Sequence, residues 1–175
     1  MQHIMLDLET MSSQSYGVIV SIGAIRFDLN TGKQKDAFYQ NIDIQSCLDL
    51  GLEVTGSTIE WWLTQSEAAR THLLKNQINI TDALNLFSEF VTKEDYIWGN
   101  SARFDCGILQ NAYNKSKQEI PWDFRKERCL RTLVSLKPSV KDTVLRKGVA
   151  HNALDDCSHQ VENLCSSWKL LNVNI

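Results

Sequence analysis

The chain has 175 residues, of which 43% are hydrophobic and 22% charged, an ordinary globular composition that predicts a single domain over residues 1–175. A formal net charge of −3 excludes a strongly basic nucleic-acid-binding domain. The sequence has no apolar run near the ~20 residues of a membrane span and has five cysteines without a C-x-x-C pair. Its first residues show neither the basic region nor the apolar region of a signal peptide, so we do not expect one. We therefore expect a cytoplasmic protein without a membrane partner.

The first predicted element is a strand over residues 4–9, where aliphatic residues at even positions alternate with Met5, Asp7 and Glu9. Asp7 and Glu9 then share one strand face, about 7 Å apart. Two buried carboxylates repel each other unless they are partnered, and hard oxygen ligands suit Mg²⁺ or Mn²⁺. The alternative for this D-x-E pattern alone is a solvated face with both carboxylates in water.

Three further strands are predicted. Residues 18–28 and 37–44 are rich in β-formers and flank a turn at residues 30–33, so the first three strands form an antiparallel meander. Residues 96–99 are the fourth and shortest strand.

Helices are expected where apolar residues recur at helical spacing or follow a capping residue. Ser57 or Thr58 is predicted to cap the first of them, and Thr81 or Asp82 to start the second. Two more are predicted over residues 105–115 and 129–136. The clearest helix begins near Asn152, which resembles a capping box with Asp155, and its apolar stripe continues to residue 171.

Trp61 and Trp62 are adjacent, so on a helix they point in different directions. One of them is a candidate for stacking on a nucleotide base in a cleft. The alternative is that one lies in the core while the other is partly exposed.

Residues 115–147 carry ten Lys and Arg against four Asp and Glu. Such a stretch indicates either a surface that follows phosphates or a solvated helical face. The sequence leaves both interpretations open.

Acidic residues and one histidine recur at the ends of the predicted elements. They form D-x-E at Asp7 and Glu9, N-x-x-x-F-D over residues 100–105, and H-x-x-x-x-D from His151 to Asp156. Taken alone, each of these motifs is also typical of a helix cap or of an acidic residue that interacts with a helix dipole. In this order they resemble the DEDD exonucleases of the ribonuclease H-like superfamily, in the branch with a histidine in the third motif (DEDDh).

Four phrases are similar to small bacterial and phage exoribonuclease-like proteins related to the C-terminal part of exodeoxyribonuclease VIII. They are LDLETM at residues 6–11, STIEWWL at 57–63, IWGN at 97–100 and HNALDD at 151–156. The resemblance runs from residue 4 to about residue 171. It implies an α/β, ribonuclease H-like fold with a mixed five-stranded sheet, its first three strands antiparallel, flanked by helices.

The resemblance also implies the catalytic groups. Two Mg²⁺ or Mn²⁺ ions are expected on Asp7, Glu9, Asp105 and Asp156. His151 is expected to act as general base, because imidazole titrates near neutral pH. The spacing H-x-x-x-x-D selects Asp156 rather than Asp155 as the ligand.

Substrate contacts are expected next to these groups. Thr10 and Met11 directly follow the D-x-E strand, so their backbone and the Met11 side chain are candidates for the terminal nucleotide. The candidates for sugar or base contacts are Asn100, Phe104 and one of Trp61 and Trp62.

The predicted activity is metal-dependent 3′-5′ hydrolysis of single-stranded nucleic acid, releasing nucleoside 5′-monophosphates. RNA is slightly favoured and DNA remains possible, since no residue announces recognition of the 2′-OH. The alternatives are a catalytically weak binding member of the fold, a two-metal phosphatase or ribonuclease H-like endonuclease, and a structural protein with scattered acids. Filled acid and histidine positions favour the exonuclease, and the resemblance makes a homodimer plausible.

Overall fold

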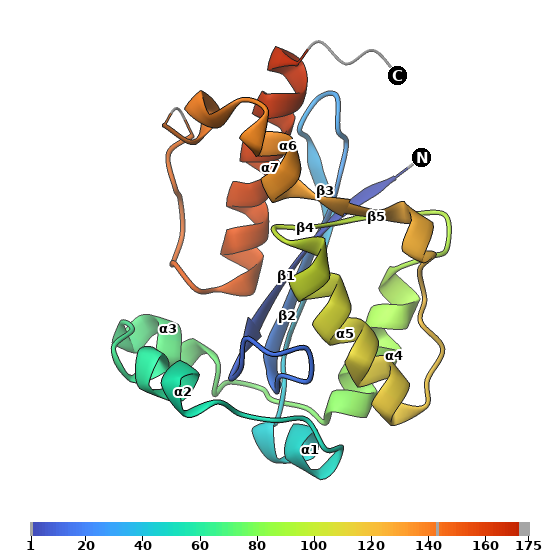
Figure 1. Ribbon diagram of the computed structural model, residues 1–175, viewed down its shortest axis with the longest axis vertical. Helices are drawn as coiled ribbons and strands as arrows, with labels where there is room; N and C mark the ends of the chain where they lie inside the picture. Colours follow the sequence, from blue (N-terminus) through green and yellow to red (C-terminus); the bar gives the residue numbers. More distant parts are fainter. Residues whose placement is uncertain (1, 143, 172–175) are drawn as a thin grey trace.

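The computed structural model describes residues 2–142 and 144–171, which form one twisted sheet with helices on both faces (Figure 1). The strand order is β3-β2-β1-β4-β5. β1 pairs antiparallel with β2 and β2 with β3, whereas β4 is parallel to β1 and β5 to β4. The expected mixed five-stranded sheet is confirmed. Its strands are β1 His3–Thr10, β2 Ile19–Phe27, β3 Gln34–Asn41, β4 Tyr96–Gly99 and β5 Glu127–Cys129.

The described part of the chain has seven α-helices and two short 3-10 helices. They are α1 Ile44–Asp49, α2 Gly56–Leu63, α3 Glu67–His72, α4 Ile80–Phe90, α5 Ala102–Ser116, α6 Leu130–Ser135, α7 Ala153–Leu170, η1 Phe124–Lys126 and η2 Pro138–Asp142. Of these, α6, η2 and α7 follow the last strand. None of the helices in this part of the chain has the length and apolar character needed to cross a bilayer.

Two predicted helix starts were wrong by a few residues. α4 begins after Asn79, whose side chain accepts a hydrogen bond from the Thr81 N–H (2.9 Å). α2 begins after Thr55, one turn before the position that was expected. In both cases the N-cap is a polar residue just before the predicted one, Thr55 for α2 and Asn79 for α4, in an extended conformation. The sequence offers several polar residues in a row, and spacing alone does not show which of them is the N-cap.

The alternation along β1 divides the core into two clusters. Ile4, Leu6 and Leu8 face α4 and α5 in the larger cluster, while Met5 packs with α6 and α7 in the other. Asp7 and Glu9 continue the Met5 side of the strand, because successive side chains point to opposite faces. The sheet therefore directs both carboxylates towards α7.

α7 approaches the sheet closely because Gly23 of β2 has no side chain. A Cβ on Gly23 would lie 2.5 Å from the carbonyl carbon of Ala153, the first residue of α7. Asn152 caps the helix as predicted, and its side chain accepts hydrogen bonds from the Leu154 and Asp155 N–H groups (3.1 Å each). The first turn of α7, which carries Asp156, is thereby fixed against β1 and β2.

Candidate active site

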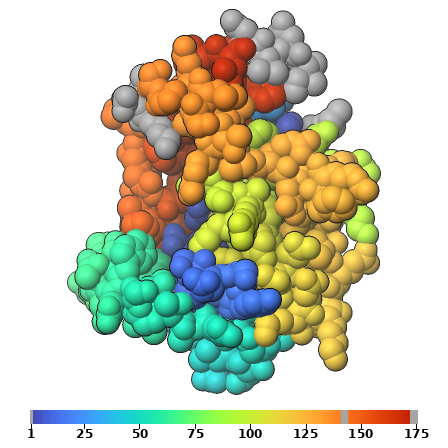
Figure 2. Space-filling model, viewed as in Figure 1, coloured from blue at the N-terminus to red at the C-terminus, as the bar shows by residue number. Residues whose placement is uncertain are grey.

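A cleft of about 470 Å³ opens where β1 ends, between α6 and α7. It is bordered by Asp7, Glu9, His151 and Asp156, and by polar side chains from α6 and α7. In Figure 2 the hollow lies between the orange segment before α7, the green α2–α3 region and the yellow-green start of α5. Segments far apart in the sequence therefore meet at the carboxyl end of β1.

Asp7 and Glu9 occupy the floor of this cleft. Glu9 is buried, and burial followed by the charge of Asp105 raises its pKa to about 8. Burial, with the charges of Asp105 and Glu9, also raises the pKa of Asp7 well above its usual value. Asp7 Oδ1 accepts a hydrogen bond from Gln160 Nε2 at 2.6 Å. Both carboxylates are crowded in a poorly solvated site, which favours their neutral forms.

Asp105 reaches β1 from the first turn of α5. Its Oδ1 accepts from the Leu8 N–H (3.4 Å) and its Oδ2 from the Ser101 N–H (3.3 Å). A Cβ on Gly99 would lie 2.7 Å from Asp105 Oδ2, so only glycine at the end of β4 permits this approach. Burial raises the pKa of Asp105 to about 7.

His151 and Asp156 complete the cluster from the start of α7. Ligand atoms of Glu9, His151 and Asp156 lie within 4.8 Å of one another. His151 has a φ of +65°, a left-handed conformation that is uncommon for residues other than glycine and asparagine. The Trp61 ring packs edge-on against the imidazole, with 4.8 Å between centroids. Burial and the charge of Arg146 lower the pKa of His151, which keeps the imidazole neutral near pH 7.

Asp155 has a different role from its neighbour Asp156. Its Oδ2 accepts a hydrogen bond from the Val149 N–H (2.8 Å), so it fixes the turn that precedes His151. The predicted reciprocal capping box with Asn152 is therefore only half present, because Asp155 turns to this loop.

The donor set fits a hard divalent cation. Carboxylate oxygens and one imidazole nitrogen converge, and the buried acids have raised pKa values. Arg146 forms an ion pair with Asp156 and lies beside the cluster, which places one positive charge where several carboxylates meet. A bound cation would remove the mutual repulsion that now favours protonation.

Gln160, Arg131 and Arg146 also line the cleft, although the sequence analysis did not single them out. Gln160 lies four residues after Asp156, and this helical spacing is the signal that points to it. Among the described residues, its Oε1 and Asn163 Oδ1 are buried atoms without a hydrogen-bond partner. The α7 side of the cleft therefore offers unused polar atoms beside the carboxylates.

The two tryptophans separate as one of the predicted alternatives requires. Trp62 is 4% exposed and its Nε1 donates to the Thr10 carbonyl (2.9 Å), so it belongs to the core and cannot stack on a base. Trp61 is 42% exposed and lies beside His151. Of this pair, only Trp61 remains a candidate for substrate contact.

Thr10 and Met11, the predicted nucleotide contacts at the end of β1, use several of their polar groups within the fold. The Met11 N–H donates to Val18 O (2.9 Å) and its carbonyl accepts from the Thr55 N–H (2.9 Å), so its backbone is occupied within the fold. The Thr10 hydroxyl donates to Ser12 O at 2.8 Å. Contact of Thr10 and Met11 with a nucleotide stays a prediction, and the partly buried Met11 side chain packs against the larger core cluster.

Asn100 and Phe104 lie on either side of the α5 start. Asn100 is exposed and lines the cleft, while its carbonyl accepts from the Arg131 N–H (3.1 Å). Phe104 is partly buried and packs against the larger core cluster. Asn100 is thus open to a ligand, whereas much of the Phe104 ring is used in packing.

The basic stretch of residues 115–147 does not form one surface. Lys115 donates to Gly51 O, Lys126 pairs with Glu94, and Lys147 pairs with Glu162. Arg131 and Arg146 line the cleft. Several of the described charges in the stretch are therefore paired with acids or bonded to backbone, and two border this cleft.

Comparison with known proteins agrees with this geometry. The model of the Rv2179c-like 3′-5′ exoribonuclease domain matches residues 2–168. An exodeoxyribonuclease of Enterobacteria phage T4 is 26% identical, over 89% of this chain and 84% of the phage protein. Cell-death related nuclease 4 (CRN-4) has a similar structure with a TM-score of 0.71 at 15% identity, covering 98% of this chain but only 64% of that nuclease.

A second solved structure is matched over most of its own length. The nuclease domain of 3′hExo, a DEDDh family member bound to rAMP, has a TM-score of 0.62 at 13% identity, over 96% of this chain and 92% of that domain. These identities establish a shared fold, while the family match extends over nearly the whole chain. The chain therefore belongs to the Rv2179c-like 3′-5′ exoribonuclease domain family and is a 3′-5′ exonuclease.

Proposed function

We propose that the protein removes single nucleotides from the 3′ end of single-stranded nucleic acid by a two-metal mechanism, with residues 1–175 acting as one exonuclease domain. The observation that carries this proposal is the convergence of Glu9, His151 and Asp156 within 4.8 Å, beside Asp7. The cations are Mg²⁺ or Mn²⁺. Their proposed ligands are Asp7, Glu9, Asp105 and Asp156.

When bound, two divalent cations stabilise the charge on the attacking and leaving oxygens of an in-line displacement. The carboxylates must be deprotonated to hold them, so their raised pKa values make cation binding and proton release one coupled event. Gln160 Nε2 donates to Asp7 Oδ1, and Asp7 lines the cleft.

His151 accepts a proton from the water that attacks the terminal phosphorus. The P–O bond to the upstream 3′ oxygen breaks and a nucleoside 5′-monophosphate leaves. The released 3′ oxygen takes a proton from solvent, so the shortened strand ends in a 3′-hydroxyl. The pKa of His151 is lowered, so the imidazole can accept that proton at neutral pH. Contact with Trp61 and the turn held by Asp155 support its orientation.

The substrate is a flexible single strand, RNA by preference. The exoribonuclease description of the family supports RNA, while the phage relative is an exodeoxyribonuclease, which keeps DNA open. The exposed Trp61 ring and the Arg131 side chain at the cleft offer a stacking surface and a phosphate partner. Free thiols at all five cysteines support action in the cytoplasm.

The test uses RNA and DNA of one sequence, labelled at the 5′ end, with Mg²⁺ or Mn²⁺ and an Asp7→Ala control. A metal-dependent ladder that shortens from the 3′ end, absent in the control, is expected, and the faster substrate identifies the preferred sugar. If neither strand is shortened while calorimetry shows that the cations still bind, the protein is a nucleic-acid-binding member of the fold without catalytic activity. Release of phosphate from a small phosphoester alone would favour a phosphoesterase.

A further inference from the structure

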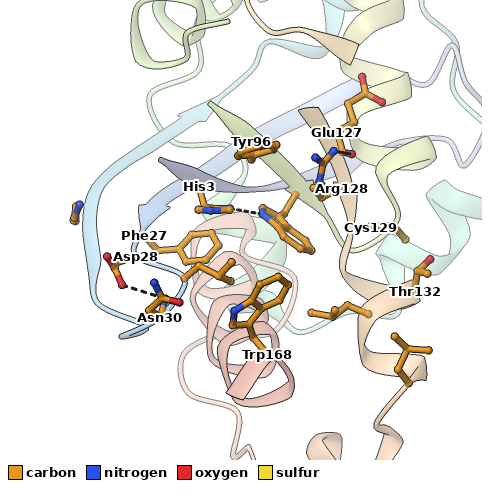
Figure 3. Close-up of a pocket in the computed structure, with 15 residues that line it drawn as sticks. His3, Phe27, Asp28, Asn30, Tyr96, Glu127, Arg128, Cys129, Thr132 and Trp168 are labelled. Carbon is orange, nitrogen blue, oxygen red and sulfur yellow. Dashed lines mark hydrogen bonds between the residues drawn. The ribbon is translucent and has the colours of Figure 1, made fainter. Parts of the chain in front are cut away.

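A second cavity, of about 710 Å³, lies at the opposite end of β1 from the catalytic cleft (Figure 3). His3 of β1 borders it, and Asp7 of the same strand face borders the cleft, about 13 Å away at the usual strand rise. α6 separates the two hollows: Leu133 and Leu136 line the cavity, whereas Arg131 lines the cleft. One short helix therefore forms a wall of both.

Aromatic side chains dominate the cavity. The His3 ring stacks on Tyr96 with 5.3 Å between centroids and an interplanar angle of 18°, and it lies 5.8 Å from the Phe27 ring. Figure 3 shows Phe27 and Trp168 around the same space, with the α6 side chains opposite. Flat rings arranged in this way suit a planar aromatic ligand, because every nucleobase has a face that can stack.

His3 also offers a directional group. The Trp98 Nε1 is a donor only, and it lies 2.9 Å from His3 Nδ1, which therefore accepts. Burial lowers the pKa of His3 to about 4, so the ring is neutral at pH 7 and keeps its proton on Nε2. The described residues 2–142 and 144–171 supply no hydrogen-bond acceptor for that N–H. A ligand with a ring nitrogen or carbonyl would satisfy it.

Charged groups of both signs border the cavity. Asp28 accepts from the Thr31 N–H (2.8 Å), and Glu127 accepts from Trp122 Nε1 (2.9 Å), so the protein itself provides donors to both acids. Arg128 lies over the Tyr96 ring at 4.5 Å and donates only to backbone carbonyls, and Lys35 has no ion pair among the described residues. The two acids balance the two bases in charge, but Arg128 and Lys35 keep N–H donors to which no carboxylate is hydrogen-bonded, and these can bind a phosphate oxygen.

We propose that this cavity is a second nucleotide-binding site, which takes a nucleobase against its aromatic side chains and the attached phosphate at Arg128 and Lys35. Its volume lies within the roughly 300–1,000 Å³ range of small-molecule sites. The nucleotide comes either from solution or from a strand whose 3′ end occupies the cleft on the other side of α6. The site acts by binding and does not require the metal chemistry of the cleft.

The test measures binding without turnover. Adenosine 5′-monophosphate is titrated calorimetrically in EDTA into the unaltered protein, Leu136→Glu and Leu74→Glu. Leu136 and Leu74 are 64% and 67% exposed, but only Leu136 lines the cavity. A carboxylate at residue 136 repels the phosphate, so the affinity is expected to fall about tenfold or more, while Leu74→Glu binds normally. Equal binding by all three proteins would overturn the proposal.

A second arm identifies the source of the nucleotide. A short labelled single strand is titrated into the same proteins and followed by fluorescence anisotropy in EDTA. Weaker binding of both probes by Leu136→Glu indicates a site that a strand also occupies, and weaker binding of adenosine monophosphate alone indicates a site for free nucleotides. If Leu136→Glu instead changes only the sedimentation coefficient, the surface is an interface between two copies and the proposal is wrong.

These readouts are independent of the proposed function. If the unaltered protein shows no hydrolysis but binds nucleotide, and Leu136→Glu weakens that binding, the hydrolytic mechanism is refuted and this site is retained. If the protein is an active exonuclease and Leu136→Glu binds nucleotide normally, the hydrolytic mechanism is retained and the second site is refuted.

Discussion

The two ends of β1 carry ionisable groups on the same face of the strand, but the surroundings of these groups differ. At the first end, burial lowers the pKa of His3, and Trp98 gives the neutral ring a hydrogen bond. At the other end, burial raises the pKa of Asp7 and Glu9, and their neighbours are further acids. The first group is stable in its neutral form without a ligand, whereas the second cluster is stable in its charged form only with added positive charge.

This difference explains why one end is suited to catalysis and the other to stacking. A divalent cation would relieve the repulsion within a buried acid cluster, so a cation is the proposed partner of this end of β1. A neutral aromatic cluster stores no such repulsion and offers surface instead. The predictions that follow test the acid end of the comparison, from the largest expected effect to the smallest.

Replacing a proposed ligand should have the largest effect. Asp156→Asn keeps the shape of the side chain but removes its charge, and should lower kcat by at least about 10³-fold, since several kcal/mol of transition-state stabilisation are lost. Asp155→Asn is the matched control, because an amide oxygen can still accept from the Val149 N–H. Single-turnover rates on labelled RNA provide the measurement. A severe defect in the Asp155 variant, with activity retained in the Asp156 variant, would reverse the assignment.

His151→Asn should lower kcat by about 10²–10⁴-fold, the usual contribution of a general base. Asparagine tolerates the left-handed backbone at this position, so the variant separates the loss of the base from added strain. Mn²⁺ affinity, measured by calorimetry, should stay nearly unchanged. A large fall in that affinity would show that the imidazole is a ligand, as its distance to Glu9 and Asp156 also permits.

Gln160→Leu should weaken Mn²⁺ binding by about 10–100-fold, the range found when a partner of a metal ligand is removed. The reason is that Gln160 Nε2 holds Asp7 Oδ1 at 2.6 Å and so orients the carboxylate. Gln118→Leu removes an amide outside the cleft and serves as the control. Unchanged affinity in the Gln160 variant would mean that packing alone orients Asp7.

The pH dependence of stability should be the smallest effect and should depend on the cation. Because the folded-state pKa values of Glu9 and Asp105 are raised, to about 8 and about 7, the metal-free protein binds more protons folded than unfolded between about pH 4 and pH 8. Its melting temperature should therefore fall as the pH rises through this window. Scanning calorimetry in EDTA measures this fall, and saturating Mn²⁺ should reduce or reverse it. A rising melting temperature in EDTA would contradict the raised pKa values.

Much of the fold follows from local sequence patterns. Period-2 alternation placed Asp7 and Glu9 on one face of β1, and the Asn152 cap fixed the start of α7 and so the position of Asp156. The order of the three motifs was enough to identify the family that the comparisons then showed. These features depend on neighbours within a few residues, which a sequence displays directly.

Only the tertiary structure decided which distant side chains meet. It buried Trp62 against Thr10 and left Trp61 beside His151, although the two are adjacent in the sequence. It brought Gln160 to Asp7, and it gathered Tyr96 and Trp168 around the second cavity. Such contacts depend on sheet order and on the close approach of α7 over Gly23, and no local pattern encodes either of them.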